Sequence, residues 1–332
     1  MIAAVLAEGM VTGKTLGNHN NEIGLPLTCC EMDSTTEVAV LEMGISAPNE
    51  MDYLTDIVQP EVAVITNIGV THMEILGSRE AIFDEKSKIY RNISPDGLVV
   101  LNGDNDILSK VQSTPAGRPL FFGLESTNDV YATDIKKEGL KGSTFTIKGL
   151  NCGDLQVHIP IPGKHMITNA LAAAAIGEYF GLSPEQIKAG IASVESVSGR
   201  THITESNGIT IIDDSYNASP ASMMSSIDTL SLAEGRKICV LGNMYELGDD
   251  SLAMHRQVGE YAASKKVDII FTCGDMAREI AEGAKSAVNE IYSFDDNESM
   301  IAKIKEVIKE GDTVMIKASN SMNFKEVAAA LK

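Results

Sequence analysis

Cysteines are few in this sequence, and long apolar runs are missing. The five cysteines include no C-x-x-C pair and are odd in number, which excludes a disulfide framework and is typical of reduced thiols in the cytosol. No stretch approaches the roughly 18 apolar residues that a membrane span needs. The N-terminal residues have no basic region before them and no cleavage-like site after them, unlike a signal peptide. We therefore expect a cytoplasmic protein that is not inserted in a membrane.

Positive charge is also scarce. Lys and Arg number 27 against 46 Asp and Glu, which gives a formal net charge of −19. The average surface would repel a phosphate backbone and an anionic membrane, so we exclude a general nucleic-acid-binding protein. A local basic pocket for a nucleotide remains compatible with this charge. At about 150 residues per domain, the 332 residues correspond to two or three domains.

The first part of the chain predicts a mainly parallel sheet with a small antiparallel patch. Apolar segments that end in polar residues predict strands, alternating segments predict antiparallel pairing, and capped periodic segments predict helices. The expected strands are 37–41, 61–66, 98–101 and 119–122, the antiparallel patch is 130–161, and helices are expected at 1–8, 78–92, 166–180 and from 184 onward.

The last third has a more regular pattern. Strands are expected at 209–213, 237–241, 267–272 and 313–317, separated by helical segments. Alternation of this kind predicts an α/β fold with a doubly wound, Rossmann-like parallel sheet. We place the domain boundary near Arg200, which gives domains 1–199 and 200–332.

One short motif is misleading. The segment Val11–Thr15 ends in the Gly-Lys-Thr of a phosphate-binding (Walker A) loop. The motif needs an earlier glycine at a fixed distance, a strand before it and a helix after it. Gly9 is one residue too close to Gly13, and a helical segment precedes the motif. We interpret the segment as a loop with a surface lysine.

Three polar side chains follow predicted strands or occupy the next helix. Glu42 could hold Mg²⁺ beside the phosphates of a nucleotide, or be a solvated carboxylate. His72 could be a metal ligand or a base, or an ordinary polar loop residue. Lys86, if buried near a metal, could lose its proton and react with CO₂, or be a solvated helix lysine. Taken singly, each of these signals is weak.

The same positions gain meaning from their order along the chain. Five segments together strongly resemble the Mur ligases: GNHNNEIGLP at 17–26, LEMG at 41–44, TNIGVTHMEILGS at 66–78, DDSYNASP at 213–220 and LGNMYELG at 241–248. The resemblance covers essentially the whole chain. Within the family, NNEIG at 20–24 and DDSYNA at 213–218 are typical of the branch that joins D-alanyl-D-alanine to a UDP-N-acetylmuramoyl-tripeptide.

This resemblance implies an ATP-dependent ligase that forms an amide bond through an acyl phosphate in the synthesis of peptidoglycan precursors. The family has a UDP-sugar domain, a central ATPase domain and a Rossmann-like C-terminal domain, and this sequence resembles the last two. The family's Walker A loop would stand just before Met1. Several charge-assisted hydrogen bonds to phosphate would then be missing, so we expect these 332 residues alone to bind ATP weakly and to have little ligase activity.

Matched positions carry over individual roles. The resemblance implies two Mg²⁺ ions, one held by Glu42 and one by His72, and a CO₂-derived carbamate on Lys86. It makes Lys86, His72 and Arg200 the catalytic residues, Arg200 through the phosphates of ATP. The remaining implied contacts are Asn169 to adenine, Asp214 and Asn217 to the nucleotide, Asn18, Asn20 and Asn21 to the muramoyl peptide, and Lys317 to the amine substrate.

Two other interpretations stay open. One is a related ligase with a different substrate, either another Mur ligase or a folylpolyglutamate synthetase, and the NNEIG segment argues against it. The other is a non-catalytic protein that keeps the fold and binds a partner. The missing Walker A loop favours this second interpretation, whereas the retention of Glu42, His72 and Lys86 opposes it.

Overall fold

The computed structural model describes residues 1–332 and divides them into two compact units. The N-terminal unit comprises Met1–Glu138, Gly142–Pro160 and Lys164–Val194, and the C-terminal unit comprises Gly139–Lys141, Ile161–Gly163 and Glu195–Lys332. None of the helices combines the length and apolar character needed to cross a membrane.

The N-terminal unit contains two sheets. Strands β1 (Thr12–Lys14) and β2 (Val38–Val40) form a parallel pair. The second sheet has the order β3-β4-β5-β6-β7-β8, with strands Val62–Ile65, Leu98–Asn102, Leu120–Gly123, Val130–Lys137, Ser143–Lys148 and Leu155–Ile159. Pairing is parallel from β3 to β6 and antiparallel from β6 to β8. The expected mainly parallel sheet with an antiparallel patch is confirmed.

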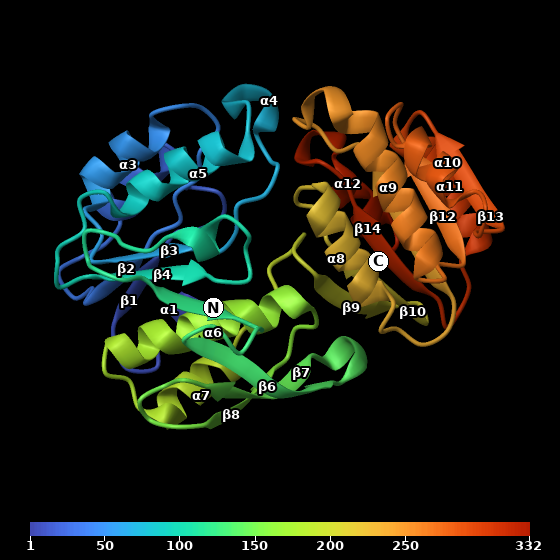
Figure 1. Ribbon diagram of the computed structural model, residues 1–332. Coiled ribbons are helices and arrows are strands. Elements are labelled where there is room, and N and C mark those ends of the chain that lie inside the picture. Colours follow the sequence, from blue (N-terminus) through green and yellow to red (C-terminus); the bar gives the residue numbers. More distant parts are fainter. The chain divides into compact units, whose positions relative to one another are not determined.

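Seven α-helices cover these strands: α1 (Ile2–Leu6), α2 (Gly24–Cys30), α3 (Glu50–Val58), α4 (Met73–Leu76), α5 (Arg79–Ser87), α6 (Lys164–Tyr179) and α7 (Pro184–Ala192). Helices α3 and α5 lie on one side of β3 and β4, and α1, α6 and α7 lie on the other (Figure 1). Successive residues of a strand point to opposite faces, so Ala63 packs with the α5 side while Val64 packs with the α6 side. The alanine-rich centre of α6 is fully buried, because small side chains let the helix lie close to the sheet.

One prediction for this unit was wrong. The segment expected to be a loop, around Gly13 and Lys14, is strand β1. Its partners are the residues of β2, with Thr12 opposite Val38 and Lys14 opposite Val40. Three residues with glycine in the middle carry no local strand signal. The pairing with β2 determines this strand, and the sequence pattern does not show the pairing.

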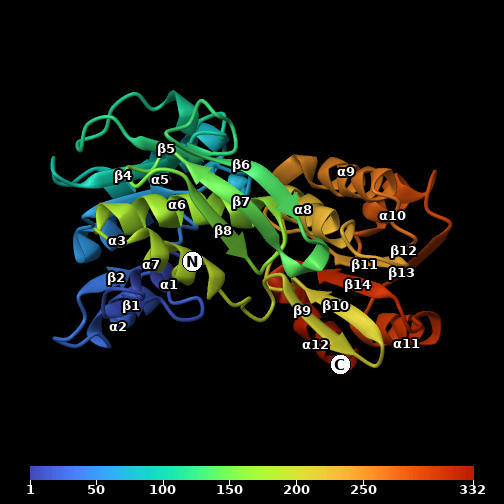
Figure 2. The ribbon, with the colours of Figure 1, turned by 90° about the horizontal axis from the view of Figure 1, so that it is seen from below.

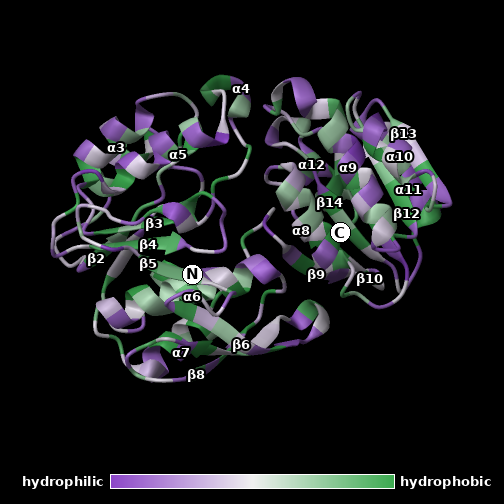
Figure 3. Ribbon diagram, in the orientation of Figure 1, coloured by the Kyte–Doolittle hydropathy of each residue, from purple (hydrophilic) through white to green (hydrophobic).

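The C-terminal unit has one six-stranded sheet in the order β13-β12-β11-β14-β10-β9. Its strands are β9 (His202–Ser206), β10 (Ile209–Asp213), β11 (Lys237–Gly242), β12 (Ile269–Cys273), β13 (Glu290–Phe294) and β14 (Thr313–Lys317). All pair in parallel except β9, which is antiparallel to β10. The hydropathy colouring of Figure 3 shows apolar central strands beneath helices of mixed polarity.

The helices of this unit are α8 (Pro220–Leu230), α9 (Ser251–Ser264), α10 (Arg278–Ala284), α11 (Asn297–Val307) and α12 (Phe324–Ala330). Figure 2 shows α8, α9 and α10 on one face of the sheet and α11 and α12 on the other. This is the expected doubly wound arrangement. Strands β9 and β13 were not predicted. The Asn207-Gly208 turn that joins β9 to β10 has positive φ at both residues, 51° and 77°, and is a hairpin signal that could have identified β9.

The loops that follow the five parallel strands, β10 to β14, all lie at the carboxyl edge of this sheet. The chain moves outward from β10 to β11, β12 and β13, and then returns to insert β14 between β10 and β11. The loops after β11 and β14 therefore leave toward opposite faces. Ligands of doubly wound folds bind where such a switch opens a crevice at the carboxyl ends of the strands.

Candidate functional site: two polar edges at the carboxyl ends of strands

Glu42 lies just beyond the carboxyl end of β2, beside Thr15, which follows the neighbouring strand β1. The backbone N–H of Glu42 donates to the Thr15 hydroxyl at 2.8 Å, and the Asn20 amide donates to Glu42 Oε1 at 3.0 Å. The carboxylate is exposed. Position 44 is glycine, which leaves room for the Asn20 side chain. A Cβ atom there would lie only 2.7 Å from the Asn20 side-chain nitrogen. Parallel pairing of two strands thus brings a hydroxyl, an amide and a carboxylate together.

The three asparagines expected to face the muramoyl peptide have different surroundings. Asn20 is held against Glu42, as described above. The side-chain oxygen of Asn21 accepts the N–H of Gly24, the first residue of α2, at 2.8 Å. Asn18 and Asn21 are exposed, whereas Asn20 is half-buried, and the side chains of Asn20 and Asn21 each make a hydrogen bond that fixes the local structure.

His72 ends the loop that follows β3 and has a φ of +66°, in the left-handed region that non-glycine residues seldom adopt. The loop is anchored by side chains from the end of β4 and from the segment that follows it. Asn102 donates to the Thr66 carbonyl at 2.9 Å, and Asn105 donates to Asn67 Oδ1 at 3.0 Å. Strained backbone of this kind persists where the surroundings determine it, and it is frequent at functional sites.

Lys86 occupies the last turn of α5, is half-buried and pairs with no carboxylate. Burial lowers the pKa of its ammonium group below the ordinary value. Lys88, two residues further, contrasts with it: hydrogen bonds to Asp52 and Glu85 raise the pKa of that lysine. The acidic groups of this region are therefore engaged by Lys88, and Lys86 remains the lysine that loses its proton more readily.

Glu85 fixes α5 against the start of α3. Its carboxylate accepts the Met51 N–H at 3.0 Å and pairs with Lys88 at 2.8 Å. Burial by itself raises the pKa of Glu85, but the hydrogen bonds from Lys88 and from the backbone amides of Asn49 and Met51 outweigh it and hold the pKa below the ordinary value. An ionised Glu85 thus sets the position of the helix that carries Lys86.

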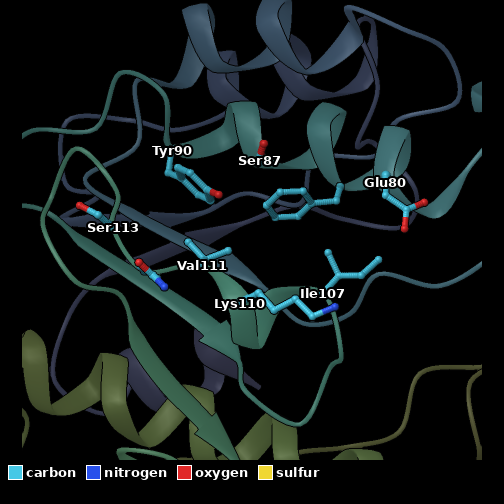
Figure 4. A pocket seen from close by; sticks show the side chains of 9 residues that line it. Glu80, Ser87, Tyr90, Ile107, Lys110, Val111 and Ser113 are labelled. Carbon is cyan, nitrogen blue, oxygen red and sulfur yellow. The ribbon is translucent and has the colours of Figure 1, made fainter.

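Asn169 and a surface groove are two further features of this unit. Asn169, the expected adenine contact, lies half-buried on α6 with its amide 4.0 Å from Met166 Sδ. A surface groove of about 460 Å³ lies between α5 and the segment 107–113, with Glu80 and Tyr90 on the helix side and Ile107, Lys110 and Val111 on the opposite side (Figure 4). None of the predicted site residues lines this groove.

The carboxyl edge of the C-terminal sheet is organised around Asp214. Its Oδ1 accepts the Thr201 N–H at 2.8 Å, and its Oδ2 accepts Lys317 Nζ at 2.5 Å and the Ser226 hydroxyl. The Asp214 side chain is 13% exposed and that of Lys317 is 5% exposed. Two residues expected to contact different ligands, the nucleotide and the amine, are therefore paired with each other.

Arg200 is exposed, and its guanidinium lies 4.3 Å from the centroid of the Tyr216 ring. No carboxylate pairs with it. A stacked guanidinium keeps its N–H donors in a fixed plane, which suits a phosphate group. Asn320 donates to the Tyr216 carbonyl at 2.9 Å, and Asn217 is exposed, with its oxygen bonded to the next backbone N–H.

Sequence reasoning missed several residues that build these edges. Thr15, Asn105, Tyr216 and Ser226 hold the expected site residues in place. A signal existed for Asn105, because polar residues after a buried strand belong to the same sheet edge as those after β3. No local signal marks Ser226, which reaches Asp214 only because α8 packs against β14.

The side chains at these strand ends fit a Mg²⁺ ion that is also bound by phosphate and water better than they fit a metal ion bound only by protein side chains. No group of three or more His, Cys, Asp or Glu side chains is placed to hold a metal ion. Magnesium keeps several waters and binds through one or two carboxylates together with phosphate oxygens. An exposed Glu42 beside a hydroxyl matches that requirement. Lys86 likewise fits a carbamate, since only a neutral amine reacts with CO₂.

Comparison with known proteins gives concordant results. The Mur ligase middle domain matches residues 1–177, and the Mur ligase glutamate ligase domain matches residues 199–320. UDP-N-acetylmuramoyl-tripeptide–D-alanyl-D-alanine ligase of Bacillus subtilis is 38% identical over 336 residues, which cover 100% of this chain and 72% of that relative.

Two solved structures extend the comparison to the fold. MurF from Acinetobacter baumannii has a TM-score of 0.91 and 29% identity, covering 99% of this chain and 72% of that chain. The MurF ligase of Thermotoga maritima, solved in complex with ADP, has a TM-score of 0.87 and 29% identity, covering 99% and 75%.

Proposed function

The chain belongs to the Mur ligase family, and we propose that it catalyses the ATP-dependent addition of D-alanyl-D-alanine to a UDP-N-acetylmuramoyl-tripeptide in peptidoglycan precursor synthesis. The observation that carries the proposal is the 38% identity over the whole chain to a ligase of that activity. The match extends to the fold, with a TM-score of 0.91 to MurF. The polar side chains that would take part in the reaction lie at the carboxyl ends of strands in both units.

The reaction needs an activated carboxylate, because an amine does not displace oxide from a carboxylate. Transfer of the γ-phosphoryl group of ATP to the peptide carboxylate gives an acyl phosphate and ADP, and the amine of D-alanyl-D-alanine then forms the amide as phosphate leaves. In the first step two anionic groups approach each other. The unpaired, stacked guanidinium of Arg200 is suited to offset that repulsion.

Glu42 and His72 would hold the two Mg²⁺ ions, and a carbamate on Lys86 would provide an anionic oxygen ligand. Bound magnesium supplies electrostatic stabilisation of the phosphate charge. The chain's own contribution is positional: Thr15 and Asn20 orient Glu42, and the loop anchored by Asn105 orients His72.

We further propose the domain division 1–199 for the ATPase domain and 200–332 for the C-terminal ligase domain. The two family matches, at 1–177 and 199–320, support it. Asn169 would contact the adenine, and Asp214 and Asn217 would lie toward the nucleotide. We place the reaction in the cytoplasm, where ATP and UDP-linked precursors are available.

The test is formation of the amide product, measured by mass spectrometry with ATP, Mg²⁺, UDP-N-acetylmuramoyl-tripeptide and D-alanyl-D-alanine. It uses the 332-residue chain and the chain joined to the N-terminal region of the Bacillus subtilis relative. Glu42→Gln in the same protein controls for ligase carried over from the host. We expect product that depends on D-alanyl-D-alanine and falls at least about 100-fold in the variant. Product with another amino acid, or no product in either form, would contradict the proposal.

A further inference from the structure

We propose that Lys317 is a positioning residue for Arg200: through its buried ion pair with Asp214 it holds the turn at Gly199–Thr201, instead of contacting the amine substrate. The turn is defined here as residues 199–201. The part of this inference that concerns turnover rests on the proposed function, whereas the part that concerns the turn does not.

Lys317 is almost fully buried, and its ammonium group is held by Asp214. Nζ lies 2.5 Å from Asp214 Oδ2 and 3.3 Å from the Asp214 carbonyl, and the side chain is 5% exposed. Lys317 ends β14 and Asp214 follows the adjacent parallel strand β10, with Asp213 opposite Ile316 in the register. The pair therefore spans two neighbouring strand ends beneath the surface of the carboxyl edge.

Asp214 transmits this anchor to the turn at 199–201. Its Oδ1 accepts the Thr201 N–H at 2.8 Å, and the Tyr216 N–H donates to the Gly199 carbonyl at 2.9 Å. Thr201 has a φ of +49°, which is costly for a β-branched residue and needs surrounding contacts to persist. Asp214 is the side chain that supplies such a contact to the Thr201 amide.

The conformation of the turn at 199–201 determines where the Arg200 side chain can lie. The guanidinium stacks 4.3 Å from the Tyr216 ring centroid, and Tyr216 is bonded to the same turn. Removal of Lys317 would leave the Asp214 carboxylate buried without its cation, which is strongly unfavourable. The carboxylate would regain water by moving outward, and the Thr201 amide would lose its acceptor. Arg200 would then lose its fixed position.

Trypsin measures this directly, because it cleaves after Arg200 only when the turn opens. We compare Lys317→Met with Lys303→Met, which removes the exposed pair with Glu306 at 2.9 Å in the same unit. Cleavage at the Arg200–Thr201 bond, relative to cleavage elsewhere in the C-terminal unit, should rise at least about tenfold in Lys317→Met and stay within about twofold in Lys303→Met. Equal rates at this bond in Lys317→Met and the unmodified chain would overturn the proposal.

Two further variants cover a failure of Lys317→Met to fold. The double variant Asp214→Asn/Lys317→Met removes the buried charge but keeps an oxygen for the Thr201 N–H, so cleavage should return to within about threefold of the unmodified chain. Ser226→Ala removes a neutral donor to the same Oδ2 and should accelerate cleavage by about threefold. A double variant that is cleaved as fast as Lys317→Met, or no effect of Ser226→Ala, would contradict the assigned route through Asp214.

Kinetics separate positioning from substrate contact. Lys317→Met should raise the KM for ATP about tenfold and leave the KM for D-alanyl-D-alanine within about twofold. An unchanged KM for ATP together with a raised KM for D-alanyl-D-alanine would show that Lys317 contacts the amine and would refute the inference. If no form of the chain has ligase activity, the proposed function fails, and the trypsin result still decides whether Lys317 positions the turn.

Discussion

Asn105 offers the sharpest test of how the His72 loop is held. The residue is 8% exposed, and its side chain makes four hydrogen bonds. The amide nitrogen donates to Asn67 Oδ1 at 3.0 Å and to the Ile68 carbonyl at 3.3 Å, while the oxygen accepts two backbone N–H groups, each at 3.1 Å. Asn105→Asp keeps the accepting oxygen and the shape but removes both donors, so it isolates the contacts to the loop.

The magnitude follows from these contacts. Two neutral hydrogen bonds lost at about 1 kcal/mol each give about 2 kcal/mol. The Ile68 carbonyl keeps a second donor, Arg79 at 2.9 Å, but Asn67 Oδ1 loses its only side-chain donor and faces a carboxylate. We therefore expect Asn105→Asp to lower the free energy of local opening by roughly 2–3 kcal/mol. That corresponds to a loss of hydrogen-exchange protection of about 30- to 150-fold.

The assay is hydrogen exchange of the amides of residues 66–72 by mass spectrometry, together with urea unfolding followed by circular dichroism. Asn151→Asp is the matched control, because Asn151 is exposed and its amide bonds only to Glu178 at 2.9 Å; it should change stability by less than about 0.5 kcal/mol. Ligase turnover should fall in Asn105→Asp, since His72 ends the same loop. Exchange at 66–72 that matches the unmodified chain would refute the reasoning.

Two further predictions concern titratable groups. Burial lowers the pKa of Lys86 whereas hydrogen bonds raise that of Lys88, so cyanate at pH 8 should carbamoylate Lys86 at least about tenfold faster than Lys88 by peptide mass spectrometry; equal labelling would contradict the assignment. Burial lowers the pKa of His255 below 6.5, and its Nε2 accepts the Met244 N–H at 2.9 Å. The folded state therefore favours the neutral imidazole, and its contribution to stability is present above pH 6.5 and lost as the pH falls toward the lowered pKa. Between pH 7 and pH 5, the free energy of unfolding measured with urea should fall less in His255→Gln than in the unmodified chain. An equal fall in both proteins would exclude this explanation.

Much of the fold follows from local patterns. Ser183-Pro184 predicts the start of α7, and the structure shows Ser183 accepting the Gln186 N–H in a capping box. Ser78 similarly caps α5. The alternation of apolar strands with capped helices predicts the doubly wound sheet of the C-terminal unit. The signals succeed because caps and periodicity depend on residues within a few positions of one another.

The missed elements depend on distant partners. Strand β1 exists because Thr12–Lys14 pairs with Val38–Val40, and strand β13 exists because it adds to the edge of β12. Thr12–Lys14 has no strong strand signal of its own, whereas Glu290–Phe294 contains Ile291, Tyr292 and Phe294, which favour strands and could have identified β13. The antiparallel strand β9 is an intermediate case, since its hairpin turn is visible in the sequence but its place at the sheet edge is not.

For the candidate site, too, the sequence indicated some features and the tertiary structure decided others. The order of the motifs along the chain was enough to indicate the family and the reaction class, and it predicts Glu42, His72, Lys86 and Arg200 as site residues, because reactive side chains recur at fixed places in a family. The tertiary structure alone decided how those groups are held. It joined Lys317 to Asp214, left Lys86 without a carboxylate, and anchored the His72 loop through Asn105. Charge pairing and desolvation depend on distances between segments far apart in the chain, and only folding sets those distances.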